Sequence, residues 1–426
     1  MDRRNFIKHL AATAAMASLA GRTGVAQQAP KGKNRQSAPR TLVFISDLHM
    51  NVDADYSWFS DHAGPLAGFL DSINNRGDVT ELIILGDLLD NWVTPVTDPV
   101  NSFADVLAAA ANGPVIAALQ DVCANPAIDV TYVTGNHDML SFDSLSRGLI
   151  GNTFPGMTII SNEPGLGAYS KNDIIWAEHG HRYCLFNAPD TWSRPNSHLP
   201  LGYFISRLAA SKSVADQQVH TTPDVLDYFL KLPDNELRRM PAISGNQVQR
   251  KLKKGVVDDA LIIAVYEAIA LWAGVPLWDR YHMGGLDKWA PDPFVAAIGV
   301  VFDKIFSCWP DRQNIVSNLE AVLDDIGRLS GPANLLFEMP PWLKKRYPFT
   351  PRIVLFGHTH KAALQYHSEG NGTIYANTGT WIDSSPMSWV EVHISGDHTN
   401  EHTYTVALWF MGENGPRQQA SITVPY

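Results

Sequence analysis

The chain has 426 residues, of which 45% are hydrophobic and 18% charged, and its formal net charge is -10. This length fits two domains, or one domain with a large insertion, and the acidic balance argues against a general nucleic-acid-binding protein, which needs a basic surface. The three cysteines form neither a CxxC pair nor an even disulfide set; they are Cys123, Cys184 and Cys308.

Residues 1–26 have the composition of a targeting segment. The pair Arg3 and Arg4 precedes an alanine-rich apolar stretch over 9–21, and a small-residue cleavage site follows at 24–26. This order resembles a twin-arginine export signal. We therefore expect export to the periplasm or the extracellular space by the twin-arginine machinery, and the alternative is an ordinary amphipathic helix. Residues 27–40 are polar and basic, which predicts a linker.

The next part of the chain alternates strand and helix patterns. Strands are predicted over 42–46, 82–85 and 130–134, with helices over 63–75, 103–111 and 115–124 between them. This βαβ order predicts parallel pairing. A helix over 141–149 and strands over 157–161, 168–171 and 173–177 follow.

Residues 191–345 carry helical patterns, over 201–210, 223–232, 260–273, 293–307 and 312–329. Two of these helices, 260–273 and 293–307, are almost wholly apolar but too short to span a bilayer. They are either buried helices packed together or a lid that offers apolar surface to a greasy substrate or to a membrane face.

Strand patterns resume after residue 345, and the first of them, over 352–356, leads to the last candidate ligands. Short alternating strands follow over 363–367, 373–376, 389–394 and 403–410, and these predict a mainly antiparallel second sheet. We thus expect one catalytic domain, residues 41–190 and 346–426, interrupted by a helical insertion at 191–345.

Polar side chains able to bind metals follow five of these strands. Asp87 comes after the apolar run 82–85 and Gly86. The other strand ends supply Asp47 and His49, Asn136 with His137 and Asp138, His179, and His358 with His360. Because ligands of α/β sheets bind outside the carboxyl ends of the strands, these segments predict one shared site.

Carboxylates, imidazoles and one amide suit Mn, Fe, Co, Ni or Zn, whereas calcium sites use oxygen almost alone. The set is larger than one ion needs, and two ions sharing Asp87 as a bridging carboxylate would use it fully. Two divalent metals can grip phosphate oxygens and polarise a bridging water into a hydroxide nucleophile.

Taken in order, five segments of the chain resemble the five blocks of the calcineurin-like metallophosphoesterase superfamily; they are 47–49, 86–90, 135–138, 179–180 and 357–360. The resemblance implies an α/β fold, a four-layer β-sandwich flanked by helices, here with a large helical insertion. It also implies the ligands of two divalent metal ions: Asp47, His49, Asp87 and His360 for one, and Asp87, Asn136, His179 and His358 for the other.

The resemblance further implies that His137 binds the phosphate and protonates the leaving oxygen while Asp138 orients its ring. Asp90 is expected to orient the turn of Asp87. For His181 three interpretations stay open: a contact to substrate or to a ligand, a metal ligand, or neither.

The segment 86–92, with a helical insertion before the last ligands, is similar to the UDP-2,3-diacylglucosamine pyrophosphatase branch, which hydrolyses a lipid-linked diphosphate. That branch commonly has arginine where this chain has His137, and the export signal would separate the protein from lipid A synthesis. We therefore expect a different small-molecule or lipid-linked phosphoester, one with an apolar group.

The sequence thus predicts an exported dinuclear-metal phosphohydrolase that cleaves phosphoester or diphosphate bonds by a metal-bridged hydroxide, with peripheral membrane contact through the insertion. The alternative is a non-catalytic envelope protein that binds a lipid or a partner on the same fold.

Overall fold

The computed structural model describes residues 40–95, 98, 100–142, 144–161, 167–172, 174–181, 187, 201–220, 351–368, 372–382, 386–395 and 403–425. The targeting segment, the linker before residue 40 and four of the five helices expected in the insertion lie outside these residues. Within them, no helix combines the length and the apolar character needed to cross a membrane.

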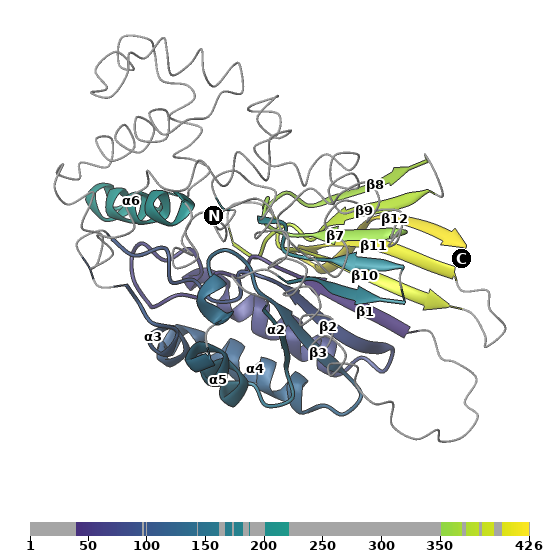
Figure 1. The fold of residues 1–426 in the computed structure, drawn as a ribbon, viewed down its shortest axis with the longest axis horizontal. Coiled ribbons are helices and arrows are strands. Elements are labelled where there is room, and N and C mark those ends of the chain that lie inside the picture. Colours follow the sequence, from purple (N-terminus) through teal and green to yellow (C-terminus); the bar gives the residue numbers. More distant parts are fainter. Residues whose placement is uncertain are drawn as a thin grey trace, which may run out of the picture.

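The described strands form two sheets (Figure 1). The first has seven strands in the order β12-β11-β10-β1-β2-β3-β4. They are β1 (Arg40–Ile45), β2 (Val79–Leu85), β3 (Asp129–Val133), β4 (Thr158–Ile160), β10 (Ser388–Ser395), β11 (Thr403–Gly412) and β12 (Gly415–Pro425). Strands β1 to β4 pair in parallel, which confirms the expected βαβ pairing.

The second sheet has five strands in the order β5-β6-β7-β9-β8. They are β5 (Tyr169–Lys171), β6 (Ile175–Ala177), β7 (Ile353–Phe356), β8 (Ala363–His367) and β9 (Thr373–Asn377). Strands β6, β7 and β9 are mutually parallel, whereas β5 and β8 are antiparallel edge strands.

The helices connect the strands of the first half. They are α2 (Ala63–Asn74), α3 (Phe103–Ala108), α4 (Gly113–Ala124) and α5 (Ser144–Thr153), with short 3-10 helices η1 (Ser60–His62), η2 (Ala110–Asn112) and η3 (Met139–Phe142). Helix α6 (Leu201–Asp216) confirms the first helix expected in the insertion and extends it by about one and a half turns.

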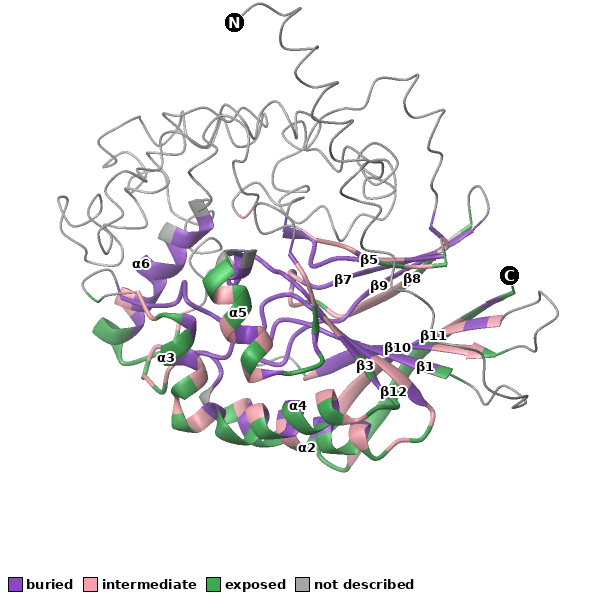
Figure 2. Cartoon of the chain, turned by 60° about the horizontal axis from the view of Figure 1, so that its bottom comes forward, coloured by how far each residue is buried: buried purple, intermediate pink, exposed green. Residues whose placement is uncertain are grey.

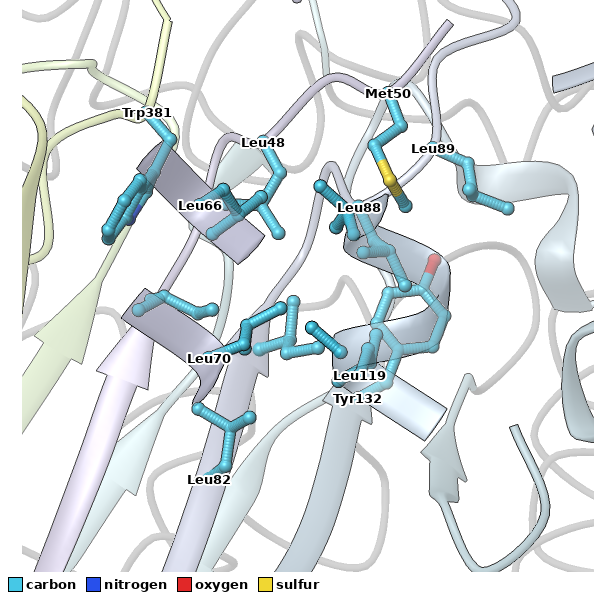
Figure 3. Close-up of a cluster of buried hydrophobic side chains, with 14 of the residues drawn as sticks. Leu48, Met50, Leu66, Leu70, Leu82, Leu88, Leu89, Leu119, Tyr132 and Trp381 are labelled. Atoms are coloured by element: carbon cyan, nitrogen blue, oxygen red, sulfur yellow. The ribbon is translucent and has the colours of Figure 1, made fainter. Parts of the chain in front are cut away.

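Two apolar cores follow from the alternation of side chains along each strand. In β1, Val43 and Ile45 face the helices, whereas Leu42 and Phe44 face the second sheet. Figure 3 shows the first core, where Leu66 and Leu70 of α2 lie near Leu82 of β2. The second core fills the space between the sheets, so the described part is an α/β fold with a helical layer and two sheets.

The expected antiparallel second sheet is wrong. Strands β10 to β12 extend the first sheet through antiparallel pairing of β10 with β1, in which Val43 pairs with Glu391. Strands β7 to β9 instead join β5 and β6 in a mixed sheet. The alternation in a sequence indicates which face of a strand is buried but not which strand lies beside it. Strand β12, which the sequence did not predict, is an edge strand with mostly exposed residues.

Candidate metal centre

The loops that leave the carboxyl ends of five strands meet at one edge of the two sheets. Asp47 follows β1, Asp87 follows β2, Asn136 follows β3 and His179 follows β6, while His358 and His360 follow β7. The loops at this end of the sheets are largely buried (Figure 2). The polar side chains therefore lie together in a protected site, although polar residues on loops are usually exposed.

Distances between side-chain atoms define the cluster. Nε2 of His360 lies 3.2 Å from Oδ1 of Asp47, and Nε2 of His179 lies 3.2 Å from Oδ2 of Asp87. Nε2 of His49 lies 3.6 Å from the same Oδ2 of Asp87. The ligand atoms of Asp47, His49 and His360 lie within 4.8 Å of one another, and so do those of Asp47, Asp87 and His179.

The other two expected ligands adjoin these groups. Oδ1 of Asn136 lies 2.9 Å from Nε2 of His179. The ring centroid of His358 lies 5.1 Å from that of His179, and the backbone amide of His358 donates to Oδ2 of Asp47 over 2.9 Å. The structure thus brings together every residue that the sequence nominated as a ligand.

The backbone of this site is unusual. Seven described residues other than glycine have positive φ, and five of them belong to the site: Asp47 (55°), His49 (50°), Asp87 (53°), His358 (68°) and His360 (56°). Such conformations are sparsely populated and concentrate where function requires them. They are held by hydrogen bonds between the first two loops, because the amides of Leu48 and His49 both donate to the carbonyl of Asp87, over 2.9 and 2.8 Å.

Three glycines allow the loops to approach one another, and only Gly86 has a left-handed φ, of 81°. A Cβ on Gly86 would lie 2.6 Å from the Cα of Gly135 and from the ring of His179. A Cβ on Gly135 would overlap the carboxylate of Asp87, and one on Gly357 would overlap Ser46 and the carboxylate of Asp47. Gly86 thus allows a left-handed turn as well as a close contact, whereas Gly135 and Gly357 are needed for close approach alone.

The electrostatics indicate that the site needs positive charge. Burial alone raises the pKa of Asp47, but the charge of His179 and the interaction with His360 outweigh it and lower this pKa to about 2. Burial lowers the pKa of His179, yet the charges of Asp87 and Asp47 raise it to about 9. Oδ1 of Asp47 is buried and, apart from the ring of His360 at 3.2 Å, has no hydrogen-bond donor among the described residues. A cation would fit here, because a buried carboxylate oxygen must be compensated.

The histidine rings are oriented to present Nε2 to such a cation. Nδ1 of His179 lies 2.7 Å from the carbonyl oxygen of Leu85, and Nδ1 of His49 lies 2.9 Å from Oδ2 of Asp90. Both partners can only accept in their usual ionisation states, so the neutral ring carries its proton on Nδ1 and a lone pair on Nε2. This is the usual arrangement of a metal-binding histidine.

The carboxylate beside His137 is Asp90, which corrects our expectation for Asp138. Nδ1 of His137 lies 2.9 Å from Oδ2 of Asp90. Asp138 instead accepts hydrogen bonds from backbone amides, with its Oδ1 2.6 Å from the amide nitrogen of Gly135 and its Oδ2 2.7 Å from that of Leu88. Burial and the charge of Asp87 raise the pKa of Asp138 to about 7.

Asp90 thus does more than orient a turn. Its Oδ1 accepts from the amides of Trp92 and Val93 over 2.8 and 3.0 Å, while its Oδ2 contacts the rings of His49 and His137. Burial raises the pKa of Asp90, but its contacts with His137 and His49 outweigh burial and lower this pKa below its usual range.

Several residues near the site were not singled out from the sequence. The rings of Trp58 and Trp92 both pack near His137, with centroids 5.6 and 4.6 Å from that of the imidazole. Nδ2 of Asn187 lies 3.3 Å from Nε2 of His358. His181, by contrast, was considered from the sequence; it is buried, with its ring centroid 5.4 Å from that of His179, so it adjoins an expected ligand. Of these residues, only Trp92 had a sequence signal that could have indicated it, because it ends the segment 86–92 quoted above.

Comparison with known proteins gives one family. Residues 40–234 match the model of the calcineurin-like phosphoesterase family. No curated protein matches the sequence significantly.

Similar solved structures include a dimetal phosphatase from Danio rerio, with 12% identity, coverage of 91% of this chain and 100% of that one, and a TM-score of 0.35. They also include Vps29 from Chaetomium thermophilum, with 9% identity, coverage of 91% and 98%, and a TM-score of 0.28. Residues 40–234 are thus similar to calcineurin-like phosphoesterases, and the described residues hold a largely buried cluster of histidines and aspartates that is a candidate metal site.

Proposed function

We propose that this protein hydrolyses phosphoester or diphosphate bonds with two divalent cations that share Asp87. The observation that carries the proposal is the position of Asp87, whose Oδ2 lies 3.6 Å from Nε2 of His49 and 3.2 Å from Nε2 of His179. One carboxylate oxygen therefore adjoins an imidazole of each expected group of ligands.

The ligand roles in this proposal follow the two groups. Asp47, His49 and His360 would hold one ion and Asn136, His179 and His358 the other, with Asp87 between them. The amide of Asn136 adds an oxygen without adding charge, which keeps the set from being overloaded with anions. When bound, such a pair of ions neutralises phosphate charge and lowers the pKa of a water molecule. Mn, Fe, Co, Ni and Zn all suit this mixture of ligands.

His137 would bind the phosphate and give a proton to the leaving oxygen. Its ring lies within the cluster, because one of its nitrogens is within 4.8 Å of a ring nitrogen of His49 and of a carboxylate oxygen of Asp87. Asp90, rather than Asp138, would hold Nδ1 of this ring and leave Nε2 for the substrate. A protein that only binds a lipid or a partner has no use for this arrangement, so His137 favours catalysis over the alternative of a binding protein.

We further propose that the protein is exported by the twin-arginine machinery and acts on a phosphoester with an apolar group. Support comes from the order of the arginine pair, the apolar stretch and the small residues at 24–26, and from the apolar helical patterns in 191–345. Replacing both Arg3 and Arg4 by lysine should retain the protein in the cytoplasm. Unchanged export would refute the signal.

The catalytic proposal is tested with the purified protein, prepared metal-free and then reconstituted with Mn, Co, Ni, Zn or Fe. We expect hydrolysis of bis-p-nitrophenyl phosphate or p-nitrophenyl phosphate and two metals per chain by elemental analysis. Asp87→Asn removes the shared charge and should lower the metal content and abolish turnover, whereas Asp121→Asn, an exposed control on α4, should not. No hydrolysis with any of the five metals would overturn the proposal.

A further inference from the structure

Helix α6, the first helix after the interruption of the catalytic domain, is attached to the loop that follows Asp90. Arg207 on this helix is fully buried. Its Nε donates to the carbonyl of Thr94 over 3.2 Å, and its Nη2 donates to the carbonyls of Pro95 and Asp98 over 2.7 and 2.5 Å. One guanidinium thus binds three backbone carbonyls of a single loop, which a planar group with five donors is suited to do.

The same loop reaches the candidate site through Trp92. The indole ring of Trp92 packs against the imidazole of His137, with centroids 4.6 Å apart and planes inclined by 32°. Trp92 also meets the ring of Tyr203 edge to face, with centroids 5.9 Å apart and an angle of 89°. The hydroxyl of Tyr203 in turn accepts from Nη1 of Arg207 over 3.2 Å.

Two routes therefore connect α6 with the ring of His137, and all of their side chains are buried. One runs through the edge-to-face contact between the rings of Tyr203 and Trp92. The other runs along the backbone from the carbonyls bound by Arg207 to Asp90, whose Oδ2 lies 2.9 Å from Nδ1 of His137. Without the guanidinium, the buried carbonyls of Thr94 and Pro95 would lose this donor. Such a loss costs about 1–3 kcal/mol for a buried polar group, so the loop would shift.

We propose that Arg207 is a positioning residue, which with Tyr203 fixes Trp92 and thereby the ring of His137. The inference rests on the proposed function, in which His137 protonates the leaving oxygen. Helix α6, at the start of the helical insertion, thus sets the geometry of proton transfer to the leaving group and does not hold metal.

The effect should depend on the leaving group. General acid help is worth about 10²–10⁴-fold and matters most for a poor leaving group, and a misplacement of about 1 Å costs up to about 10²-fold. Arg207→Lys keeps the charge but loses the planar fork. We expect it to lower kcat for an alkyl phosphoester about 10–100-fold, to change kcat for the p-nitrophenyl ester less than about threefold, and to leave the metal content unchanged.

A double-mutant cycle tests whether Arg207 acts through His137. In a His137→Ala background, Arg207→Lys should cause no further loss on the alkyl ester, because residues that act through one another are not additive. Trp92→Phe is the second variant, should Arg207→Lys fail to fold. Arg147→Lys is the matched control, since Arg147 of α5 is an exposed arginine that donates to the backbone carbonyl of Ser161. Additive losses, or equal losses on both esters, would overturn the inference.

A spectroscopic measurement separates this inference from the proposed function. In metal-free protein with isotope-labelled histidine, the ring protons of His137 should carry a ring-current shift from Trp92. That shift should change in Arg207→Lys and in Trp92→Phe but not in Arg147→Lys. An unmoved His137 signal in the first two variants refutes the positioning role even if the enzyme is active. A changed chemical shift of His137 in these two variants, together with no hydrolysis by the wild type, would support the positioning role and refute the proposed hydrolysis.

Discussion

Replacing Asp90 by asparagine should weaken metal binding even though Asp90 is not among the expected ligands. Its Oδ1 accepts from the amides of Trp92 and Val93, and its Oδ2 lies 2.9 Å from Nδ1 of both His49 and His137. An asparagine has the same shape but one acceptor oxygen fewer. Whichever way the amide turns, one of these two pairs of contacts then faces a donor instead of an acceptor.

The size of the effect follows from the two orientations. If the NH₂ group faces the rings, Nδ1 of His49 no longer keeps its proton, and the proton moves to the nitrogen that must bind the metal. Loss of such a supporting partner costs about 10–100-fold in metal affinity or activity, or about 1.4–2.8 kcal/mol. If the NH₂ group faces the loop, two amides lose their acceptor, and the free energy of unfolding falls by about 1–3 kcal/mol.

Both quantities can be measured on one preparation. Titration calorimetry of metal-free protein with Mn²⁺ gives the affinity, and urea unfolding of the same metal-free protein gives the stability. Asp121→Asn on the exposed face of α4 makes the same chemical change away from the site and controls for it. An Asp90→Asn protein with wild-type Mn²⁺ affinity and wild-type stability would refute the assignment of Asp90 as the support of both rings.

Three further predictions concern single positions. His137→Ala should leave two metals per chain by elemental analysis and reduce the hydrolysis rate about 10²–10⁴-fold; an unaltered rate on an ester with a poor leaving group would exclude His137 from the reaction. Gly135→Ala forces a Cβ into the carboxylate of Asp87 and should lower both metal content and thermal stability, so a fully loaded, stable variant would contradict the close approach. Asp78→Asn tests pH dependence: the hydrogen bond from Arg76 is the largest influence on the pKa of Asp78 and lowers it from 3.8 to about 2. The contribution of this ion pair to the free energy of unfolding should therefore be complete above pH 3.8 and vanish as the pH falls through about 2. Because the pair is so exposed, the substitution should lower the free energy of unfolding at pH 7 by at most about 1 kcal/mol, as measured by urea unfolding across pH. A loss of stability that persists below pH 2 would rule out this charge pair.

The sequence predicted well what depends on local pattern. The apolar runs before Asp47, Asp87 and Asn136 are strands within one to three residues of the expected bounds, and their parallel pairing is confirmed. Short strands with polar residues at their ends are local signals. Because parallel strands end at a common edge, the convergence of the ligands followed from that pattern and from the resemblance of the motifs.

What the sequence did not predict depends on partners far along the chain or on side-chain direction. Strand β10 alternates as a strand should, but nothing in it specifies β1 as its neighbour. Asp90 and Asp138 each close a motif that begins with a glycine, so the two look alike in the sequence. Only the direction of each side chain determines which carboxylate reaches His137. Arg207 is a single cation in an apolar helix pattern, and its purpose appears only once the loop carbonyls lie beside it.

The left-handed loops after β1 and β7 are linked by a hydrogen bond from His358 to Asp47 across 311 positions of sequence. During translation, a chain extended only to residue 181 already carries five of the seven expected ligands. It still lacks His358 and His360, and it also lacks β10, one of the two strands that flank β1. In the proposed function, full coordination of the ions must then wait until the ribosome has passed residue 360. Stable binding of cations would therefore mark a chain that has been synthesised through β7, which shorter products cannot imitate.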